Sequence, residues 1–311
     1  MIQNVMRNYF KEPITGHKIL RDKERLVAEV EVDGKTFYLK GEKQSAAFVE
    51  KMIGFIDMMR NAKLPFSMSK LTLDGKPYVE HDGLIFILEE KGKGKPIETL
   101  RLRNIQEIGA MLGKQHAASM RSAFSFGRGT SWGMFGGNET EELGDYDENE
   151  LCYWDLVSAV EDKYEKEMSL IQELYKKRRA VLQAEWAALP KGAVQGDLLP
   201  YNLLFQQDRI SAIFDFDIAG DEVLVNECVG NAIFLAWHHE FEGLESPKER
   251  YDAYMDAYCS ERPFSDCEKE MIPHLFAIIR AFRYDRIEEG IEKMKSGKGK
   301  SFLNESIMLL S

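Results

Sequence analysis

Three oxygen-bearing side chains occur close together in one short segment and are of the types that bind a metal ion and accept a proton. Asp197 and Asn202 flank a turn that contains Pro200, and Asp215 follows the next pair of apolar runs. Carboxylate and amide oxygens are ligands that Mg²⁺ takes when nucleotide phosphates and water supply its other ligands. A further carboxylate can accept the proton of an attacking hydroxyl. Each residue alone also suits an ordinary turn, but the combination favours a magnesium site at Asn202 and Asp215 with Asp197 as base.

The segment that carries these residues is expected to be a β-hairpin. The apolar run 203–205 follows Asn202 directly, 206–209 has the composition of a tight turn, and 210–214 returns as a second apolar strand. Such a hairpin brings Asn202, just before its first strand, close to Asp215, just after its second. Asp197 then lies a loop's length away.

The region before this segment has the pattern of strands with one helix. Asp33 and Gly34 separate two runs of alternating apolar residues, which is a strong hairpin signal because both turn positions favour positive φ. A second Asp-Gly pair at Asp74 predicts another hairpin, and the apolar run 84–88 predicts a buried strand. Between them, 45–62 carries apolar residues at helical spacing.

The charged, glycine-rich stretch from Glu89 to Pro96 is expected to join two lobes. We predict an N-terminal nucleotide-binding lobe at 1–90, a hinge at 91–97 and a catalytic and substrate lobe at 98–311. The lysine- and glycine-rich segment 295–301 is expected to be a loop, since it lacks the spacing of a phosphate-binding loop. Helical patterns of the second lobe cover 102–120, 151–189, 226–242, 247–259 and 266–295, with a strand-rich interval at 193–219.

Composition limits the class of protein. The chain of 311 residues is 44% hydrophobic and carries a formal charge of −11, which argues against nucleic acid as a partner and suits a cationic small substrate. Its apolar runs are shorter than the roughly 18 residues of a membrane-spanning helix. The N-terminal residues lack a signal-peptide pattern, so we expect a cytoplasmic protein without a membrane partner. The four cysteines are too scattered for a disulfide scaffold or a Cys-x-x-Cys metal site.

The central segment resembles the aminoglycoside phosphotransferase and choline kinase family of small-molecule kinases. The family pattern is His-Gly-Asp, a short spacer, Asn, an apolar strand and then Ile-Asp-Phe or Ile-Asp-Trp; here Gln195 and Gly196 precede Asp197, and Phe214 and Phe216 flank Asp215. The resemblance implies an α+β, bilobal, protein-kinase-like fold: an N-terminal antiparallel β lobe with one main helix, and a larger, mostly helical C-terminal lobe. It also implies ATP and Mg²⁺ as cofactors.

The resemblance extends to further site residues. Lys40 is similar to the lysine that contacts the α and β phosphates, Glu50 is the expected ion-pair partner of Lys40, and Glu89 and Glu90 fall where hinge backbone groups bind adenine. Asp217 is expected to support the metal ligands. Gln195 stands where the family has His and can still donate and accept hydrogen bonds, and His116 is expected to be structural.

The function implied is transfer of the γ-phosphoryl group of Mg·ATP to a hydroxyl of a small molecule such as an aminoglycoside, an amino alcohol or homoserine. Two alternatives stay open: a catalytically reduced binding or structural protein on the same scaffold, and a metal-dependent phosphohydrolase. The acidic run 139–150 suits either an anionic rim for an amine-bearing substrate or a solvated loop. His238 and His239 are assigned to structure, because adjacent helical residues point about 100° apart. A monomer or a homodimer is expected.

Overall fold

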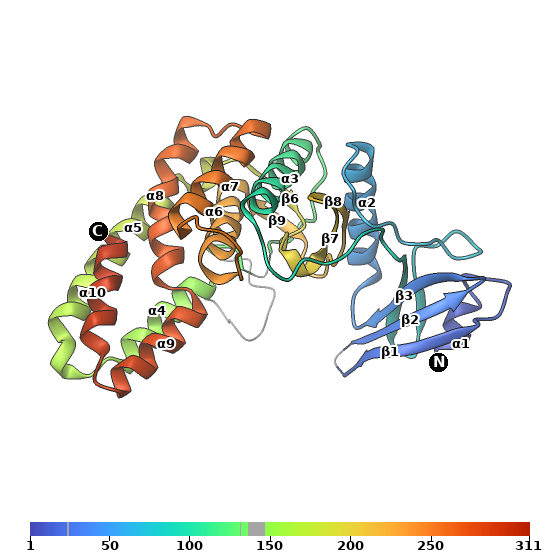
Figure 1. Ribbon diagram of the computed structural model, residues 1–311, viewed down its shortest axis with the longest axis horizontal. Helices are drawn as coiled ribbons and strands as arrows, with labels where there is room; N and C mark the ends of the chain where they lie inside the picture. Colours follow the sequence, from blue (N-terminus) through green and yellow to red (C-terminus); the bar gives the residue numbers. More distant parts are fainter. Residues whose placement is uncertain (24, 131, 136–146) are drawn as a thin grey trace. The chain divides into compact units, whose positions relative to one another are not determined.

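The computed structural model describes residues 1–23, 25–130, 132–135 and 147–311. The chain forms two compact units: Met1–Glu98 with Pro200–Phe216, and Thr99–Leu199 with Asp217–Ser311. The first unit contains an antiparallel sheet and the second is mostly helical (Figure 1), which confirms the predicted α+β class.

The sheet of the first unit has the strand order β1-β2-β3-β5-β4, and neighbouring strands are antiparallel. Asp33 and Gly34 join β2 to β3 with φ angles of 48° and 70°, which confirms the first predicted hairpin. The elements of this unit are α1 (Ile2–Met6), β1 (Gly16–Asp22), β2 (Leu26–Val32), β3 (Lys35–Glu42), α2 (Ala46–Asn61), β4 (Val79–His81), β5 (Leu84–Glu90), the 3-10 turn η3 (Pro200–Asn202), β7 (Leu203–Gln206) and β8 (Arg209–Ile213).

The second predicted hairpin, around Asp74, is wrong. The Thr72 hydroxyl donates to the Asp74 carboxylate and accepts from the backbone N–H of Lys76, so this segment closes a local turn without strands. The hairpin that contains β5 instead turns at Asp82 and Gly83, whose φ angles are 51° and 77°.

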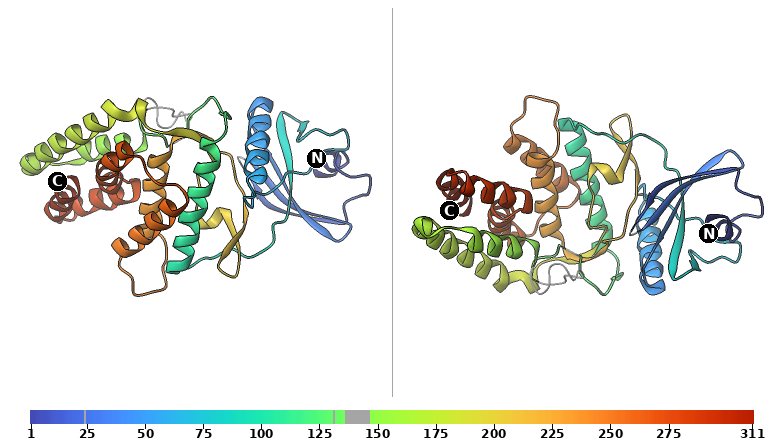
Figure 2. Two further views of the ribbon diagram at one scale, coloured as in Figure 1. Left: turned by 90° about the horizontal axis from the view of Figure 1, so that it is seen from above. Right: turned by 90° about the horizontal axis from the view of Figure 1, so that it is seen from below.

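The apolar face of this sheet packs against α1. Alternate residues of β2 and β3 are buried, β5 is buried over five consecutive residues, and the Tyr9 hydroxyl donates to the carbonyl oxygen of Phe86 at 2.8 Å. Helix α2 begins at the N-cap Ser45, whose side chain accepts from the backbone N–H of Phe48. Figure 2 shows α2 running beside the sheet. The core residues on the α1 side are Ile2, Val5, Met6, Tyr9, Leu26, Ala28, Val30, Val32, Phe37, Leu39, Phe86 and Leu88.

The hairpin of β7 and β8 belongs to the first compact unit. The backbone of Lys95 pairs with that of Phe205, and the Ser211 hydroxyl donates to the carbonyl oxygen of Lys93. Gly94 permits this approach, because its φ is 116° and a Cβ there would collide with the Ser211 hydroxyl. The predicted hinge therefore packs on this hairpin. The predicted division into lobes at 1–90, 91–97 and 98–311 remains a prediction.

The second unit is built from helices with one two-stranded sheet of β6 and β9. Helix α3 has the predicted bounds, whereas the long run predicted at 266–295 is two helices separated at Phe282 and Arg283, and a helix begins inside the segment predicted as the 295–301 loop. The elements are α3 (Leu102–Met120), α4 (Glu148–Ala159), η1 (Asp162–Tyr164), α5 (Glu165–Glu185), η2 (Trp186–Ala188), β6 (Lys191–Val194), β9 (Gly220–Val223), α6 (Leu224–Ile233), the π-helical turn η4 (Phe234–His238), α7 (Pro247–Glu261), α8 (Asp266–Ala281), α9 (Tyr284–Lys295) and α10 (Gly299–Leu310).

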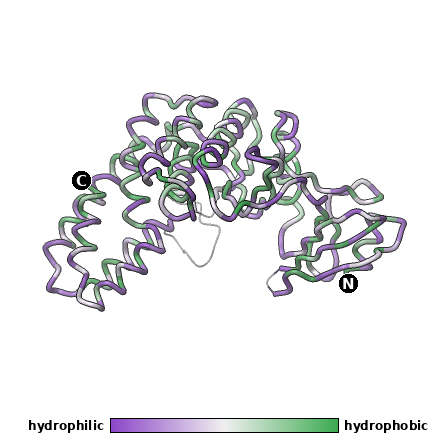
Figure 3. Tube along the Cα trace, viewed as in Figure 1, coloured by the Kyte–Doolittle hydropathy of each residue, from purple (hydrophilic) through white to green (hydrophobic). Residues whose placement is uncertain are grey.

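Helices α3 and α7 approach each other closely at two glycines. A Cβ on Gly109 would lie 2.5 Å from the carbonyl oxygen of Tyr254, and one on Gly113 would lie 2.7 Å from that of Tyr258. Figure 3 shows hydrophobic and hydrophilic residues alternating along the helices of this unit, as expected where one stripe of each helix is buried. Within the described ranges, no helix combines the length and apolar character needed to cross a membrane.

Candidate active site

Asp197 lies in a tight loop that follows β6 in the second unit. The side-chain oxygen of Gln195 accepts from the backbone N–H of Asp197 at 2.9 Å, and the Asp197 carbonyl accepts from the N–H of Leu199 at 2.8 Å. Gly196 has a φ of 86°, and a Cβ there would lie 3.0 Å from the carbonyl oxygen of Ile218. The loop therefore requires glycine at 196, and Gln195 takes part in fixing its shape.

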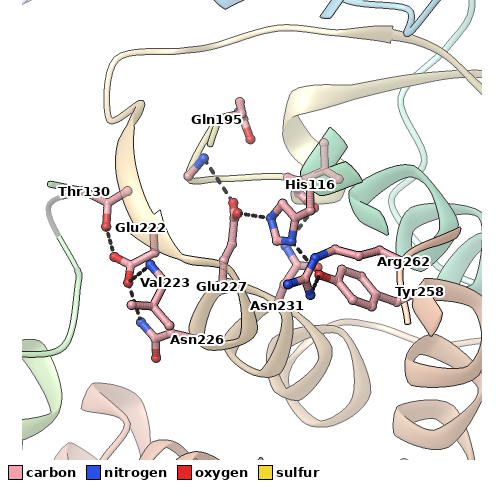
Figure 4. A network of polar contacts seen from close by, with 12 residues as sticks. His116, Thr130, Gln195, Glu222, Val223, Asn226, Glu227, Asn231, Tyr258 and Arg262 are labelled. Atoms are coloured by element: carbon pink, nitrogen blue, oxygen red, sulfur yellow. Dashed lines mark hydrogen bonds and ion pairs between the residues drawn. The ribbon is translucent and has the colours of Figure 1, made fainter. Parts of the chain in front are cut away.

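A buried series of hydrogen bonds holds this loop against the helices of the second unit (Figure 4). The Gly196 N–H donates to the Glu227 carboxylate at 3.1 Å, and the other oxygen of Glu227 lies 2.6 Å from His116 Nε2. His116 Nδ1 lies 2.7 Å from the Tyr258 hydroxyl, whose oxygen in turn accepts from Arg262 at 2.8 Å. These partners assign the proton of His116 to Nε2, with the Tyr258 hydroxyl donating to Nδ1. His116 is fully buried and is placed here as a structural residue.

Three more side chains hold the backbone around Asp197 and Asp217. Trp132 Nε1 donates to the carbonyl oxygen of Gly196 at 2.8 Å, and Asn231 Nδ2 donates to that of Leu198 at 3.0 Å. Arg128 donates to the carbonyl oxygen of Asp217 at 3.1 Å. Sequence reasoning missed Trp132, Asn231 and Glu227, because their contacts join residues far apart in the chain.

Asn202 and Asp215 lie at the same end of the β7–β8 hairpin, as predicted from the sequence. Leu203 pairs with Ile213, and the N–H of Phe214 donates to the carbonyl oxygen of Asn202 at 3.1 Å. Asp215 has a φ of 66°, a left-handed conformation that Asp tolerates better than most residues. Such a conformation needs support from its surroundings and is often found at functional sites.

A cation from the same unit faces this carboxylate. Arg25, in the connection between β1 and β2, lies 3.4 Å from Asp215 Oδ2. No residue of this connection is among the site residues predicted from the sequence. Arg25 is therefore an addition to the candidate site.

Lys40 forms an ion pair with Glu89 at 3.1 Å, and both side chains are largely buried. The predicted pairing of Lys40 with Glu50 is wrong. Lys40 lies opposite Ile87 on β5, so Glu89 is its diagonal neighbour on the same face of the sheet. Glu50 lies on the exposed face of α2, whose apolar face is buried.

The oxygen donors of the hairpin fit Mg²⁺. An amide and a carboxylate side chain suffice when nucleotide phosphates and water complete the octahedron. Of the residues that the structure describes, no three His, Cys, Asp or Glu side chains come together as a metal cage.

The family of this chain follows from its similarity to known proteins. The model of the phosphotransferase enzyme family (APH) matches residues 15–264. The chain belongs to this family. The phosphotransferase-family assignment agrees with the resemblance found in the sequence.

Curated relatives of this phosphotransferase-family chain include homoserine kinases. That of Rhizobium johnstonii is 26% identical over 205 residues, covering 66% of this chain and 55% of the relative. That of Polaromonas naphthalenivorans is 28% identical over 131 residues, covering 40% of each. The matched regions thus span about half of these relatives' length or less.

Solved structures similar to this phosphotransferase-family chain show its fold. A microcompartment-associated aminopropanol kinase has a TM-score of 0.69 at 18% identity, covering 99% of this chain and 95% of that one. The amicoumacin kinase hAmiN, solved with AMP-PNP, Ca²⁺ and Ami, has a TM-score of 0.63 at 18% identity, covering 93% and 88%. An aminoglycoside phosphotransferase from Alicyclobacillus acidocaldarius has a TM-score of 0.62 at 15% identity, covering 99% and 96%. They confirm the expected protein-kinase-like fold.

Two other sequence features of this phosphotransferase-family protein are structural where they are described. His238 Nδ1 lies 3.0 Å from the Asp285 carboxylate, so the side chain contacts another part of the same unit. In the acidic run, Asp147 and Glu150 both bind Arg179, at 2.6 and 2.7 Å. Four further acidic residues of that run, Glu139, Glu141, Glu142 and Asp145, lie outside the described residues.

A second buried carboxyl lies near the Asp197 loop. Glu222 on β9 accepts hydrogen bonds from Thr130 at 2.6 Å, from the Val223 N–H at 2.8 Å and from Asn226 at 3.3 Å (Figure 4). Desolvation, together with the neighbouring charge of Glu227, outweighs those hydrogen bonds and raises the pKa of Glu222 to about 7. The native state therefore holds this proton at pH values where the unfolded chain has lost it.

Replacing Glu222 by Gln should flatten the pH dependence of stability. Between the ordinary pKa of 4.5 and about 7 the native protein binds more protons than the unfolded chain, so the free energy of unfolding falls as pH rises. The loss by about pH 8 is on the order of 3 kcal/mol in the parent and is absent in Glu222→Gln. Urea denaturation at about pH 5 and about pH 8 measures it. The exposed Glu270→Gln on α8 is the control and should follow the parent; a parent curve with no such slope would contradict the prediction.

Proposed function

We propose that this protein transfers the γ-phosphoryl group of ATP, with Mg²⁺, to a hydroxyl of a small molecule. The observation that carries the proposal is that the two candidate metal ligands share one hairpin end and that Asp197 precedes this hairpin by a few residues of chain. Asn202 and Asp215 lie at one end of a hairpin, and Asp197 lies in a loop held by hydrogen bonds. Asp197 and Asn202 are five residues apart, so the chain keeps their Cα atoms within about 18 Å of each other in any arrangement of the units.

Each residue has a distinct part in the proposed reaction. Asp197 orients the acceptor hydroxyl and takes its proton as the oxygen attacks phosphorus. Asn202 and Asp215 would hold Mg²⁺, which would neutralise charge on the phosphate oxygens as the bond between the γ-phosphorus and ADP breaks and ADP leaves. Lys40, held in place by Glu89, contacts the α and β phosphates. Glu90 remains a predicted adenine contact through its backbone, and Asp217 a predicted support for the metal ligands.

Binding alone, without catalysis, is supported less well. One departure from the family pattern is Gln195, and its side chain still accepts from the N–H of Asp197. The series of hydrogen bonds that links Gly196 to Arg262 through Glu227, His116 and Tyr258 is unbroken. The sequence also keeps Asp197, Asn202 and Asp215 at the family spacing, which a site that had lost its activity would have no reason to keep.

The acceptor class rests on the relatives. Their names include homoserine kinases and an aminopropanol kinase. Homoserine and aminopropanol both carry a hydroxyl and an amine on a short carbon chain. We propose an acceptor with these groups, a cytoplasmic location and either a monomer or a homodimer.

The test is ADP release from Mg·ATP by the purified chain with a panel of acceptors: homoserine, ethanolamine, choline, aminoglycosides, macrolides and sugars. We expect one acceptor class to stimulate ADP release well above the rate without acceptor. Phosphate release at the same rate without any acceptor would favour the phosphohydrolase. No stimulation, together with no thermal stabilisation by Mg·ATP, would overturn the proposal in favour of a non-catalytic protein.

A further inference from the structure

Arg25 lies at the end of the connection between β1 and β2, one residue before β2 begins at Leu26. Nη2 of its guanidinium lies 3.4 Å from Oδ2 of Asp215, the candidate metal ligand that follows β8. The two side chains are 25% and 24% exposed, so that ions and small molecules can reach both. The contact joins two residues of the first unit that are 190 positions apart in the sequence.

The backbone around Asp215 is held by the segment that follows α2. Backbone hydrogen bonds of 2.8 and 2.9 Å join Ile213 to the segment 65–67. The Phe216 ring stacks on that of Phe66, with the ring centroids 5.5 Å apart. The backbone on either side of this carboxylate is therefore fixed within the first unit by contacts other than the ion pair, and a change of ion-pair partner need not move it.

The strand register places Arg25 on the same face of the sheet as Lys40. Val27 pairs with Lys40, and residue 25 precedes Val27 by two positions, a spacing that brings side chains to the same face of a strand. The alternate residues of β2 are buried against α1. The face opposite α1 therefore carries two cations, and each lies beside a carboxylate.

A carboxylate with a guanidinium beside it is a poor ligand for a free divalent ion. The metal must displace the guanidinium or bind next to a positive charge, and either condition lowers its affinity. A metal that arrives together with a nucleotide avoids this cost, because a phosphate oxygen can accept from the guanidinium as the metal takes the carboxylate. Arginine suits such a second partner, since its planar set of N–H donors matches the geometry of phosphate oxygens.

We propose that Arg25 exchanges partners when nucleotide binds: it pairs with the Asp215 carboxylate in the nucleotide-free protein and contacts a phosphate group in the complex. This inference rests on the proposed function and adds a condition to it, namely that the site takes up divalent metal efficiently only together with nucleotide. By linkage, the contribution of Arg25 to this coupling acts equally on the affinity for metal and on the affinity for nucleotide.

Binding of Mn²⁺ to the full chain without nucleotide, followed by electron paramagnetic resonance, tests the competition for the carboxylate. We expect Arg25→Gln to bind Mn²⁺ about tenfold more tightly than the parent does, because a charge-assisted contact no longer competes with the metal. Arg25→Lys keeps the positive charge and should stay close to the parent. Combining Arg25→Gln with Asp215→Ala should abolish the gain, which locates the added affinity at this carboxylate.

Calorimetric titration with ATP in the presence of a metal chelator tests the contact with phosphate. We expect Arg25→Gln to bind metal-free ATP about tenfold more weakly than the parent does, because the change removes the guanidinium from beside the phosphates. Arg7→Gln, at the exposed end of α1, is the matched control and should follow the parent in both titrations. Far-UV circular dichroism of each variant shows whether it is folded.

The outcomes separate this inference from the proposed function. Unchanged Mn²⁺ binding by Arg25→Gln, or a gain that persists when Asp215 is also replaced, would overturn the exchange of partners. Unchanged binding of metal-free ATP would overturn it as well. Either result would leave the kinase proposal standing where an acceptor stimulates ADP release by the parent. Both expected changes without acceptor-stimulated ADP release would support the exchange and contradict the proposed function.

Discussion

Replacing Asp197 by Asn should lower kcat by about two to four orders of magnitude, the range expected when a general base is removed. The amide keeps the size of the side chain but cannot take the proton of the acceptor hydroxyl. The backbone of residue 197 keeps its hydrogen bonds to Gln195 and Leu199, so the loop should retain its shape. Steady-state ADP release gives kcat, and thermal stabilisation by Mg·ATP should be nearly unchanged.

The control for this change is Asp252→Asn on α7. Asp252 is exposed and pairs with Lys248 one helical turn away, so its replacement should leave kcat unaltered. A variant of Asp197 with full activity would exclude this residue as the base. A loss of Mg·ATP binding would instead indicate a role in nucleotide binding.

Replacing Asp215 by Ala should lower kcat/KM by roughly a hundredfold to a thousandfold, because a metal ligand contributes several kcal/mol of charge stabilisation. The concentration of Mg²⁺ needed for half-maximal rate should also rise, which a purely structural residue would not affect. Titrating Mg²⁺ at fixed ATP measures both effects. The change also removes the ion pair of this carboxylate with Arg25.

Asp57→Asn on the exposed face of α2 is the matched control within the same unit. This variant should need the same concentration of Mg²⁺ for half-maximal rate as the parent does. If Asp215→Ala kept the parental dependence on Mg²⁺, Asp215 would be excluded as a metal ligand, whatever the change in rate.

Short sequence patterns identified most helices and strands, because neighbouring residues determine where these elements form. The Asp33–Gly34 turn formed as predicted, since both residues adopt the positive φ that the turn requires. The same reasoning was wrong at Asp74, where the Thr72 side chain closes a compact turn and no strands flank it. Periodicity found α3 but could not show the break near Phe282 within one amphipathic pattern.

The residues of the candidate site also fall into those set by local structure and those set by contacts between distant parts of the sequence. Asn202 and Asp215 could be placed together because one hairpin fixes both. The partner of Lys40 could not, since it depends on the register between β3 and β5, and this register places Glu89 beside Lys40. Contacts such as that of Arg25 with Asp215 join residues distant in sequence and have no local signal.

The way in which the Asp197 loop is held has a consequence for mutational tolerance. Glu227 binds the loop through a backbone N–H, a group that every residue except proline provides. This N–H belongs to Gly196, so the contact with Glu227 does not depend on the side chain at 195. Position 195 should therefore accept His or another side chain with an acceptor for the N–H of Asp197. Position 196 has no such freedom, because its φ of 86° requires glycine. We expect random mutagenesis to recover active clones with varied residues at 195, whereas substitutions at Gly196 or Glu227 should be lost.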